Sequence, residues 1–413
     1  MRIAIVGSGI SGLVAAHTLG PRHEVVLFEA DRRPGGHTHT IDVPTETGTM
    51  PVDTGFIVFN KKTYPSFCRL LDGLGVRAQG SDMSFSARSD TRDFEYSGTG
   101  LNGLYAQRRH FFSARFHRMV RDIFRFYREA RELLASPSEV ALEPYLRARG
   151  YSEAFIADHL LPLTAAVWSS NRRGAREFPA RFLVRFFDNH GFLQVRNPPQ
   201  WLTVRGGSRQ YVRAILDQFN GEIRTNSPVE SVSRTATGVL VKARSQDADR
   251  FDHVVIACHA DQALRLVSEP TRAESEVLSR FSFQTNHVVL HSDPALMPRL
   301  RRTWSSWNYH LDDDWTDGAA VTYWMNRLQS LSAPRQYFVT LNRTAGIRPE
   351  HTIAGMTYSH PVFTPSALEA QAEHDALINH QGVSYCGAYW RNGFHEDGVV
   401  SALRSCAHMG ATL

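Results

Sequence analysis

Short apolar runs and a helical stretch alternate at the start of the chain. Residues 2–6 and 24–28 are continuous apolar runs rich in β-branched side chains, which is typical of buried strands. Residues 13–19 lie between them and place apolar side chains at helical spacing. A glycine-rich turn, residues 7–12, separates the first run from this helical stretch. The pattern predicts a strand, a tight turn, a helix and a second parallel strand, which together begin an α/β sheet.

The turn carries glycines at the spacing of a dinucleotide-binding loop. Gly7 permits the tight turn, Gly9 lets a phosphate approach the backbone, and Gly12 lets the helix pack closely on the sheet. Ser11 lies in the same turn, and Glu29 ends the second run, where an acid binds ribose hydroxyls. We therefore predict a dinucleotide site. The alternative is a glycine-rich turn in an ordinary α/β unit.

Further periodic segments divide the chain into blocks. Helical spacing predicts helices at residues 63–74 and 114–135, and two more within 141–166 with interruptions near Gly150 and Pro162. Residues 97–103 are expected to form a loop, and we place a change of domain near residue 80. Strand patterns occur at residues 222–225, 239–243, 251–257, 287–291 and 337–341. We expect the strand at 251–257 to return to the first sheet.

The helix at 114–135 is unusually rich in arginine. The region Arg108–Arg131 has eight arginines against Asp122 and Glu129, and several phenylalanines lie among them. One interpretation is a solvated arginine face above a core-facing stripe. The functional interpretation is a patch that binds an anionic membrane surface. Nucleic acid is not favoured, because no recognised binding motif accompanies the arginines.

Composition places further bounds on the chain. A length of 413 residues indicates two or three domains, and 42% hydrophobic with 21% charged residues is ordinary for a soluble globular protein. The net charge of +5 comes from arginine, because Lys61, Lys62 and Lys242 are the only lysines. The four cysteines are scattered without a CxxC pair, so we expect no metal site, no disulfide framework and a reducing, cytoplasmic compartment. No apolar run approaches the roughly 20 residues of a membrane-spanning helix, and no targeting segment is expected before the first strand.

Three later motifs extend the first one. An RxGG turn follows Glu29, a D-x-G strand occurs at residues 52–57, and a glycine-ended strand near residue 387 precedes an acid-glycine pair. Together they resemble the flavoproteins related to amine oxidases and phytoene desaturases. That family usually has an arginine after the glycine doublet, whereas this chain has His37.

The resemblance implies non-covalent FAD as the cofactor. It also implies an α/β fold, with a Rossmann-type FAD-binding domain interleaved with an α+β substrate domain and a helical cap. We assign residues 1–80, 201–275 and 380–413 to the first and residues 81–200 and 276–379 to the second. Besides the glycine turn with Ser11 and Glu29, the resemblance assigns these cofactor contacts: Ala30, Arg33, Gly35, Gly36, His37, Thr38, Gly55, Phe56, Ile57, Val229, Gly387, Asp397, Gly398 and Val399.

Catalytic candidates come mainly from the C-terminal motif. Amine oxidases place an aromatic residue on the flavin face, and Phe394 and His395 occupy the corresponding positions here, with Glu396 and Tyr389 close in sequence. The alternative for His395 is a structural turn histidine. No convincing general base is evident; His259, like His395 and Glu396, is a candidate only because it adjoins a cofactor motif.

The segments GGHTHT, DTGFIVFN, WLTVRGGSRQYV, SSWNY and GFHEDG support a narrower resemblance. They are similar to bacterial FAD-dependent oxidoreductases associated with cyclopropane-fatty-acid-synthase-like methyltransferases. The resemblance implies a desaturase or reductase of methylated or methylenated acyl chains in membrane phospholipids. It also implies a methyltransferase partner. Because only one dinucleotide motif is visible, we expect electrons to be exchanged with a separate partner, and the Arg108–Arg131 region would give peripheral contact with the inner membrane face.

Two other functions stay open. One is an amine oxidase, which is disfavoured because no lysine follows Lys242 whereas many amine oxidases carry one near flavin N5. The other is a non-catalytic flavoprotein partner of a lipid methyltransferase. An apolar substrate would require an apolar tunnel, and the tryptophans between residues 300 and 325 either line one or are ordinary core and rim aromatics: Trp304, Trp307, Trp315 and Trp324.

Overall fold

A parallel five-stranded sheet organises one end of the molecule. The computed structural model describes residues 1–46, 48–136, 139–194, 198–312 and 318–413. The sheet has the order β10-β2-β1-β14-β20, and all neighbouring strands are parallel. Its strands are β1 (Arg2–Val6), β2 (Glu24–Phe28), β10 (Glu222–Arg224), β14 (His253–Ile256) and β20 (Val383–Tyr385). The α/β, Rossmann-type architecture expected from the sequence is confirmed.

Both faces of this sheet are covered, which explains why its central strands β1, β2 and β14 are apolar over most of their length. Alternate residues of β1 enter different cores, Ile3 and Ile5 on one face and Ala4 and Val6 on the other. The first face packs against α1 (Ile10–Leu19), α2 (Pro65–Gly73), α10 (Arg209–Gln218) and α15 (His395–Ala407). The second packs against α11 (Ala260–Leu266), α12 (Arg272–Leu278), α14 (Pro365–Gln371) and the antiparallel sheet β11 (Val229–Thr235), β12 (Gly238–Ala243) and β13 (Asp249–Phe251).

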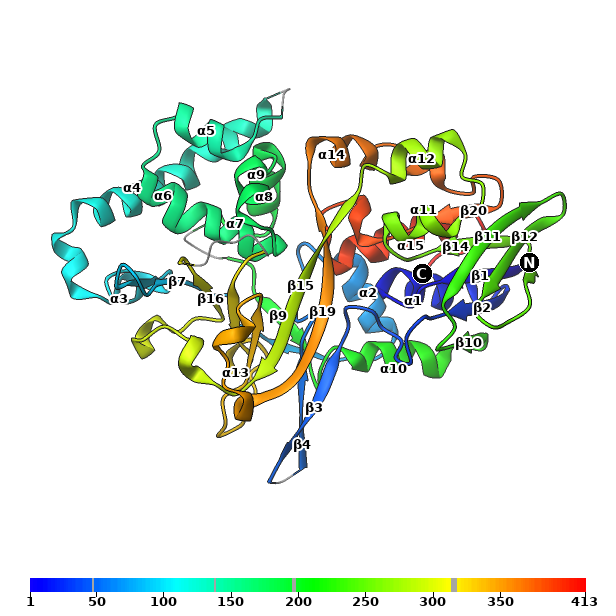
Figure 1. Cartoon of the computed structure of the whole chain (residues 1–413), viewed down its shortest axis with the longest axis horizontal. Coiled ribbons are helices and arrows are strands. Elements are labelled where there is room, and N and C mark those ends of the chain that lie inside the picture. Colours follow the sequence, from blue (N-terminus) through cyan, green and yellow to red (C-terminus); the bar gives the residue numbers. More distant parts are fainter. Residues whose placement is uncertain (47, 137–138, 195–197, 313–317) are drawn as a thin grey trace.

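A second, seven-stranded sheet forms the other lobe (Figure 1). Its order is β19-β15-β18-β17-β16-β7-β8, and only the β16–β7 pair is parallel. The strands are β7 (Phe85–Ser89), β8 (Phe94–Ser97), β15 (Ser282–His291), β16 (Trp307–His310), β17 (Val321–Trp324), β18 (Phe338–Leu341) and β19 (Thr352–Val362). The long strands β15 and β19 run from this sheet towards the parallel sheet, so they connect the two lobes (Figure 1).

Helices cover the second sheet and share one apolar core with it. They are α3 (Gly100–Leu104), α4 (Ala114–Glu129), α5 (Leu142–Ala148), α6 (Glu153–Phe155), α7 (Leu161–Trp168), α8 (Arg172–Glu177) and α9 (Ala180–Asn189), with α13 (Met325–Leu328) at the sheet's end. Short turns of other helix types are η1 (Arg108–Phe112), η2 (Ala130–Ala135), η3 (Ile156–Leu160), η4 (Pro294–Leu296), η5 (Arg301–Thr303), η6 (Thr344–Gly346), η7 (Pro349–His351), η8 (His374–Leu377) and η9 (Ala388–Trp390).

One local prediction for this helical layer was wrong. Residues 97–103 do not form a loop throughout, because α3 begins at Gly100. The interruption expected near Pro162 takes the form of the π-helical turn η3, which directly precedes α7, the helix with this proline in its first turn. The predicted helix at 114–135 exists as α4 followed by η2.

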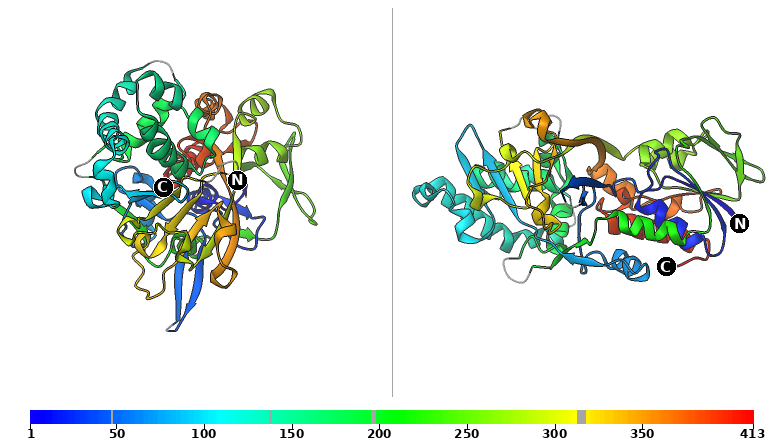
Figure 2. Two further views of the ribbon diagram at one scale, coloured as in Figure 1. Left: turned by 60° about the vertical axis from the view of Figure 1, so that its left-hand side comes forward. Right: turned by 90° about the horizontal axis from the view of Figure 1, so that it is seen from below.

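Smaller sheets lie between the lobes. Strand β9 (Trp201–Val204) pairs with β5 (Val58–Asn60) and β6 (Ala78–Gly80) in one of them. The other is the hairpin of β3 (Thr40–Thr45) and β4 (Gly48–Asp53), which projects from the body of the molecule (Figures 1 and 2). Within the part of the chain described here, no helix is long and apolar enough to cross a membrane.

Candidate functional site

The glycine turn closes tightly against the end of β14. Gly7 has a φ of +100°, and a Cβ there would lie 3.0 Å from the carbonyl oxygen of Ala257. A Cβ on Gly12 would lie 1.8 Å from the carbonyl oxygen of Gly7. A Cβ on Gly9, in contrast, would meet no described atom within 4 Å. Gly7 and Gly12 therefore let α1 pack on the sheet, and Gly9 leaves the backbone at the start of α1 approachable.

The start of α1 has the features of an anion site. None of the described side chains caps it, and its first turn contains no acidic residue. Its first N–H groups therefore point outward with the positive end of the helix dipole. Glu29 lies beside the turn, where its Oε2 accepts the Ser8 N–H at 3.0 Å and its Oε1 accepts the Asp31 N–H at 2.9 Å. An acid is thus fixed near an anion site, which is the arrangement that a dinucleotide requires.

The segment leading to Val229 runs beside this acid. The Ser227 N–H donates to the Glu29 carbonyl oxygen at 2.8 Å, and the Asn226 N–H donates to the Asp31 carbonyl oxygen at 3.1 Å. Val229, the first residue of β11, follows directly. Ala30 lies between Glu29 and Asp31, whose carbonyl oxygens accept these two hydrogen bonds. The predicted adenosine contacts Glu29, Ala30 and Val229 are therefore brought together.

The glycine doublet also contacts the turn. Gly35 and Gly36 both have positive φ, and a Cβ on Gly36 would lie 3.0 Å from the Cα of Gly9. The Arg33 guanidinium donates to the carbonyl oxygens of Thr38 at 2.7 Å and Gly36 at 2.8 Å, so in this structure it closes the doublet. The D-x-G strand packs on the same loop, because a Cβ on Gly55 would lie 2.0 Å from the His37 carbonyl oxygen.

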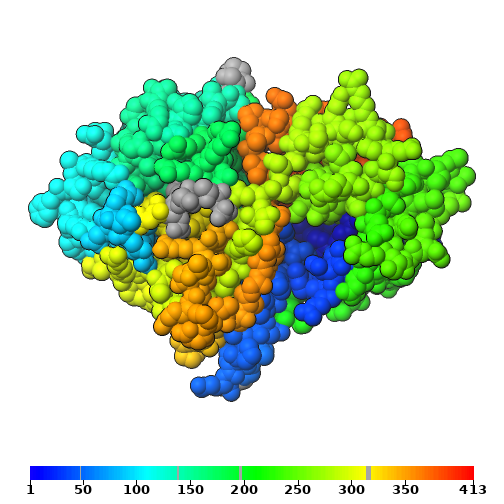
Figure 3. Space-filling view, viewed as in Figure 1, coloured from blue at the N-terminus to red at the C-terminus, as the bar shows by residue number. Residues whose placement is uncertain are grey.

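The C-terminal motif completes this arrangement. A Cβ on Gly398 would lie 2.6 Å from Ile10 Cγ2, and the Ser11 hydroxyl donates to the Gly398 carbonyl oxygen at 3.0 Å. The starts of α1 and α15 are therefore in contact, with Val399 buried in the shared core. The Gly387 N–H donates to Ser401 Oγ of α15 at 2.8 Å. The space-filling view shows part of the N-terminal segment, in dark blue, at the bottom of a hollow in the surface (Figure 3).

We call the lobe of the parallel five-stranded sheet the cofactor lobe and the lobe of the seven-stranded sheet the substrate lobe. The His395 side chain faces away from the substrate lobe. Its ring stacks on Phe56, with ring centroids 3.5 Å apart and an interplanar angle of 11°, and it meets Phe67 edge-on. Its Nε2 lies 3.1 Å from both the Thr38 hydroxyl and the Tyr211 hydroxyl. Burial lowers the pKa of His395 to about 3, so the ring stays neutral. The catalytic role predicted for His395 stays a prediction, and the enclosed imidazole favours the alternative of a structural histidine.

Phe394 faces the opposite way. Its ring centroid lies 5.0 Å from that of Phe186 in α9 and 6.3 Å from that of Trp168 in α7. Phe363, at the end of β19, approaches Trp168 from another side, with ring centroids 6.4 Å apart. We call Phe394, Trp168, Phe186 and Phe363 the aromatic wall. Phe394 packs against the core to which the other three rings belong, and its predicted place at the flavin face stays a prediction.

The other two catalytic candidates have structural surroundings. Both carboxylate oxygens of Glu396 accept backbone N–H groups at the start of α2, from Ser66 at 3.0 Å and Phe67 at 2.8 Å. Tyr389 is buried with Phe281 in the core on the other face of the parallel sheet, with ring centroids 4.9 Å apart. The catalytic roles predicted for Glu396 and Tyr389 stay predictions, and their surroundings favour structural roles, as a cap of α2 and as part of a core.

Three histidines meet beside the glycine turn. The His37 ring centroid lies 5.3 Å from that of His360 in β19 and 6.2 Å from that of His259, which precedes α11. Burial and the neighbouring imidazoles lower the pKa of His37 well below its usual range, and burial lowers the pKa of His360 to about 4. Sequence reasoning missed this cluster, because nothing in the spacing of three distant histidines predicts their contact.

Asp53 is a further buried acid that the motif alone did not explain. It accepts the Ser208 N–H at 2.9 Å and the Gln329 side-chain N–H at 2.8 Å, and the Asp53 N–H donates back to Gln329 Oε1 at 2.8 Å. Burial raises the pKa of Asp53 to about 6. This carboxylate ties the D-x-G strand to α10 and to the substrate lobe.

The tryptophans near Arg301 have surroundings that favour the alternative of ordinary core and rim aromatics over an apolar tunnel. The Arg301 guanidinium lies 3.6 Å from the ring centroid of Trp304 and 4.6 Å from that of Trp324, so these two rings face a cation. Trp307 packs against Tyr323 at 5.2 Å between ring centroids. Trp315 lies outside the described residues.

The chain is similar to known flavoproteins. The family model for the flavin-containing amine oxidoreductases matches residues 10–292. The flavin-dependent L-tryptophan oxidase RebO of Lentzea aerocolonigenes is 24% identical over 294 residues, which cover 62% of this chain and 57% of that relative. The chain thus matches little more than half of the relative's length.

Solved structures share the fold at lower identity. A putrescine oxidase variant aligns over 99% of both chains with 16% identity and a TM-score of 0.71. The CLA-producing fatty acid isomerase from P. acnes aligns over 99% of this chain and 98% of its own, with 15% identity and a TM-score of 0.67.

The residues around the glycine turn fit FAD as a cofactor. They combine an approachable backbone at Gly9, an uncapped start of α1 and a fixed acid at Glu29. Gly9, Gly36 and Gly398 lie around this turn, and the cofactor contacts assigned to them stay predictions. Because the family model also covers more than half of the chain, this protein belongs to the flavin-containing amine oxidoreductase family, and its cofactor is FAD.

Proposed function

We propose that this protein oxidises or reduces a methylated or methylenated acyl chain of a membrane phospholipid. Bound FAD supplies hydride transfer in either direction. The chain's own residues would hold the cofactor on the loops around Gly9 and Gly36 and present the acyl chain along the aromatic wall. The proposal is narrower than the family, which accommodates several substrate classes.

The observation that carries the proposal is the uncharged character of the aromatic wall. The two acids nearest in sequence to Phe394 are both used as helix caps. Glu396 accepts N–H groups at the start of α2, and Asp397 Oδ2 accepts the Phe394 N–H at 2.9 Å. An ammonium substrate would lose its hydration at such a wall without gaining a carboxylate partner, whereas an acyl chain loses nothing on leaving water.

The fold is compatible with this substrate class. One protein that shares it is named as a fatty acid isomerase, although the likeness at 15% identity concerns the fold alone. We further propose that a methyltransferase supplies the modified acyl chain and that a separate protein exchanges electrons with the flavin. The resemblance of GGHTHT and GFHEDG to the methyltransferase-associated subgroup supports the first partner. The presence of one dinucleotide motif in the sequence supports the second.

An anaerobic experiment tests the reaction and its direction. Oxidised holoprotein is mixed with phospholipid vesicles carrying either mid-chain methylated or unmodified acyl chains, and the visible absorbance of the flavin is followed. Photoreduced holoprotein is mixed with vesicles carrying methylenated chains in a second arm. We expect bleaching in the first arm for a desaturase or recovery of absorbance in the second for a reductase. No change in either arm, with the flavin still reducible by dithionite, would contradict the proposal.

Amine oxidation is the second candidate, favoured by the similarity to an L-tryptophan oxidase. It predicts peroxide release in air with one member of an amine panel that includes tryptophan, putrescine and cyclohexylamine. If the lipid proposal holds, none of these amines should reduce the flavin under anaerobic conditions. Peroxide release with an amine, together with no response to any vesicle, would select this second candidate.

A further inference from the structure

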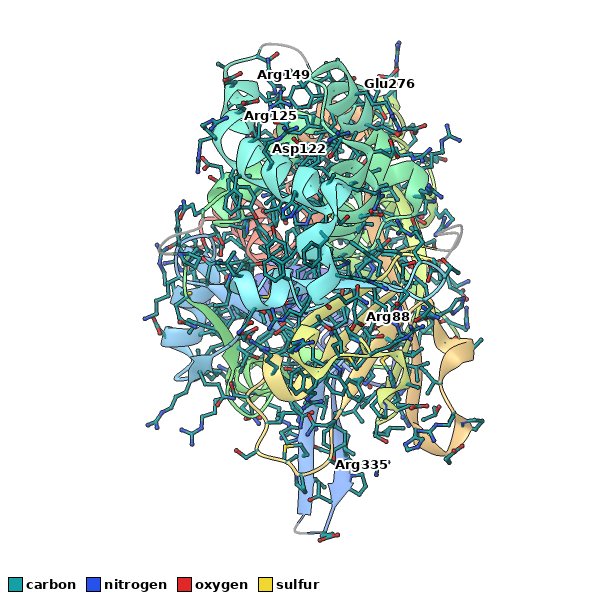
Figure 4. The ribbon with its side chains drawn as sticks, turned by 90° about the vertical axis from the view of Figure 1, so that its left-hand side faces the viewer. Arg88, Asp122, Arg125, Arg149, Glu276 and Arg335 are labelled. Atoms are coloured by element: carbon teal, nitrogen blue, oxygen red, sulfur yellow. The ribbon has the colours of Figure 1, made fainter. Side chains whose placement is uncertain are left out.

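Exposed apolar side chains are concentrated at the outer end of the substrate lobe. Apart from Met1, every large hydrophobic residue that is exposed in the described part of the chain lies between residues 101 and 140. Phe112 is 94% exposed and Leu101 is 73% exposed, while Phe111 and Phe124 are about half exposed. Figure 4 views the molecule from this end, with α4 on the side that faces the viewer.

The exposure of Phe124 follows from the geometry of α4. The opposite face of this helix buries Phe116, Met119, Ile123 and Phe126 in the core of the substrate lobe. On the outer face, Arg121 precedes Phe124 by three residues and Arg128 follows it by four, so all three side chains share one surface. Arg118 lies one turn earlier on the same face. We call Phe111, Phe112, Phe124, Arg118, Arg121 and Arg128 the α4 ridge.

The guanidinium groups of the ridge are available to a partner. Arg118 makes no ion pair with a described residue, and Arg121 reaches only Asp122, at 3.8 Å, while its side chain stays 73% exposed. Arg128 pairs with Glu129, and its side chain is 77% exposed. The acids of α4 are more buried than the arginines, with Asp122 only 1% exposed. The outer face of the ridge is therefore cationic as well as apolar.

Phe112 projects from the surface without a ring partner among the described residues. Phe111, its neighbour, stacks on Tyr105 with ring centroids 4.3 Å apart, which holds the short η1 turn in place. The turn ends at Ser113, whose hydroxyl caps α4 by accepting the Phe116 N–H at 3.2 Å. A projecting aromatic side chain on a rigid turn beside arginines suits insertion between lipid headgroups, because the ring enters the interface while the cations meet phosphates.

We propose that the α4 ridge docks this protein on a bilayer that contains anionic phospholipids. Phe112 and Phe124 would enter the interfacial region, and Arg118, Arg121 and Arg128 would contact headgroup phosphates. This inference rests on the proposed function for its biological meaning, since it names the surface from which an acyl chain would reach the substrate lobe. Nucleic acid is less well matched, because projecting rings on a convex ridge do not follow a groove of arginines.

Vesicle co-sedimentation of the holoprotein tests the ridge. Vesicles are made either of phosphatidylcholine alone or of phosphatidylcholine with phosphatidylglycerol. The triple variant Arg118→Gln, Arg121→Gln, Arg128→Gln is compared with a matched control, Arg244→Gln, Arg265→Gln, Arg272→Gln. The control removes the same charge from equally exposed arginines on the cofactor lobe, whose side chains are 67–89% exposed.

We expect the ridge variant to lose about 100-fold in partitioning onto anionic vesicles, because each arginine contributes about fivefold. The control variant should lose much less, and Phe112→Ala should lose about tenfold on its own. Salt should weaken wild-type binding. Flavin absorbance checks that each variant retains its cofactor.

Three results would overturn the inference. They are equal losses for the ridge and control variants, equal binding to both vesicle types, and a wild-type dimer that Phe112→Ala dissociates, since the ridge would then bind a second copy. Vesicle binding without any flavin response would instead contradict only the proposed reaction. A flavin response to detergent-dispersed acyl substrate without vesicle binding would contradict only the ridge.

Discussion

Phe394 and His395 are adjacent in sequence, yet their rings lie in different parts of the molecule. Phe394 occupies the position before the first turn of α15, and His395 is the first helical residue. The change from extended to helical backbone between them directs one ring to Phe186 and the other to Phe56. At the scale of single residues, a helix start therefore separates a wall of the substrate site from a support of the cofactor lobe.

Gly9 offers a test of the cofactor site that does not disturb the fold. We expect Gly9→Ala to change the free energy of unfolding by less than about 1 kcal/mol, because its Cβ meets no described atom within 4 Å. FAD affinity should fall about tenfold or more, since the methyl group stands where a phosphate approaches α1. Equilibrium dialysis of FAD and urea denaturation measure the two effects. Gly73→Ala is the control, because a Cβ there also meets no described atom within 4 Å. Unchanged FAD affinity in Gly9→Ala would contradict a phosphate site at the start of α1.

Replacing Glu396 tests whether its carboxylate acts as a helix cap or as a catalytic group. We expect Glu396→Gln to lower the free energy of unfolding by about 1 kcal/mol, because an amide replaces one acceptor at the start of α2. The rate of flavin reduction by substrate should stay within about twofold, since a cap contributes nothing to the barrier. Denaturant unfolding and stopped-flow absorbance measure these quantities. A rate loss of about 100-fold with unchanged stability would restore the catalytic interpretation.

At the scale of elements, two loops and one strand build the surroundings of the glycine turn. The loop after β14 brings His259, the doublet loop brings His37, and β19 brings His360. Asp261 is a charged neighbour of His259, and Tyr358 contacts the His37 ring. Elements from both lobes therefore determine the charge state beside the start of α1.

This cluster predicts pH-dependent retention of FAD. Without an anion, burial holds the pKa of His360 at about 4 and lowers the pKa values of His37 and His259. The pyrophosphate of FAD would raise these pKa values, so binding takes up protons and affinity falls as the pH rises from about 5 to 8. Fluorescence of released FAD, measured on holoprotein across this range, gives the dependence.

A matched pair of variants assigns the effect. His360→Asn should flatten the pH dependence, whereas His287→Asn, at an exposed position on β15, should leave it unchanged. Affinity that is independent of pH in the wild type would show that the histidines do not respond to the cofactor.

At the scale of the whole molecule, two lobes share the site and are joined through a few defined contacts. Strands β15 and β19 run between them, and Phe394 packs against the cores of both. Gln329 adds a reciprocal pair of 2.8 Å hydrogen bonds with Asp53. The buried carboxylate of Asp53 thus depends on a residue 276 positions away in the chain.

Removing this link should destabilise the protein. We expect Gln329→Leu to cost about 2 kcal/mol in the free energy of unfolding, because a buried N–H and a carboxylate oxygen lose their partner. Urea denaturation of the holoprotein measures the change. Gln218→Leu, at the exposed end of α10, is the control, and equal stabilities of the two variants would contradict the role assigned to Gln329.

Local patterns were sufficient for the cofactor lobe. The order of strand, glycine turn, helix and acid depends on short-range backbone sterics and on apolar spacing, so residues 2–29 could be interpreted correctly without coordinates. Motif resemblance assigned Gly9, Gly36 and Gly398 to one cofactor site, and the structure places Gly36 beside Gly9 and Gly398 beside Ile10 and Ser11. The helix at 114–135 was predicted because its apolar spacing persists over several turns.

Only the tertiary structure decided which neighbours of those motifs reach the substrate. The His395 ring is enclosed by other side chains, Glu396 caps a helix that is distant in sequence, and Arg301 lies between two tryptophans. Residue spacing predicts none of these surroundings. The histidine cluster and the Gln329–Asp53 pair likewise join residues from distant segments. Sequence spacing predicts the direction of a side chain relative to its own helix or strand. The surroundings of that side chain, in contrast, depend on how the two lobes pack together.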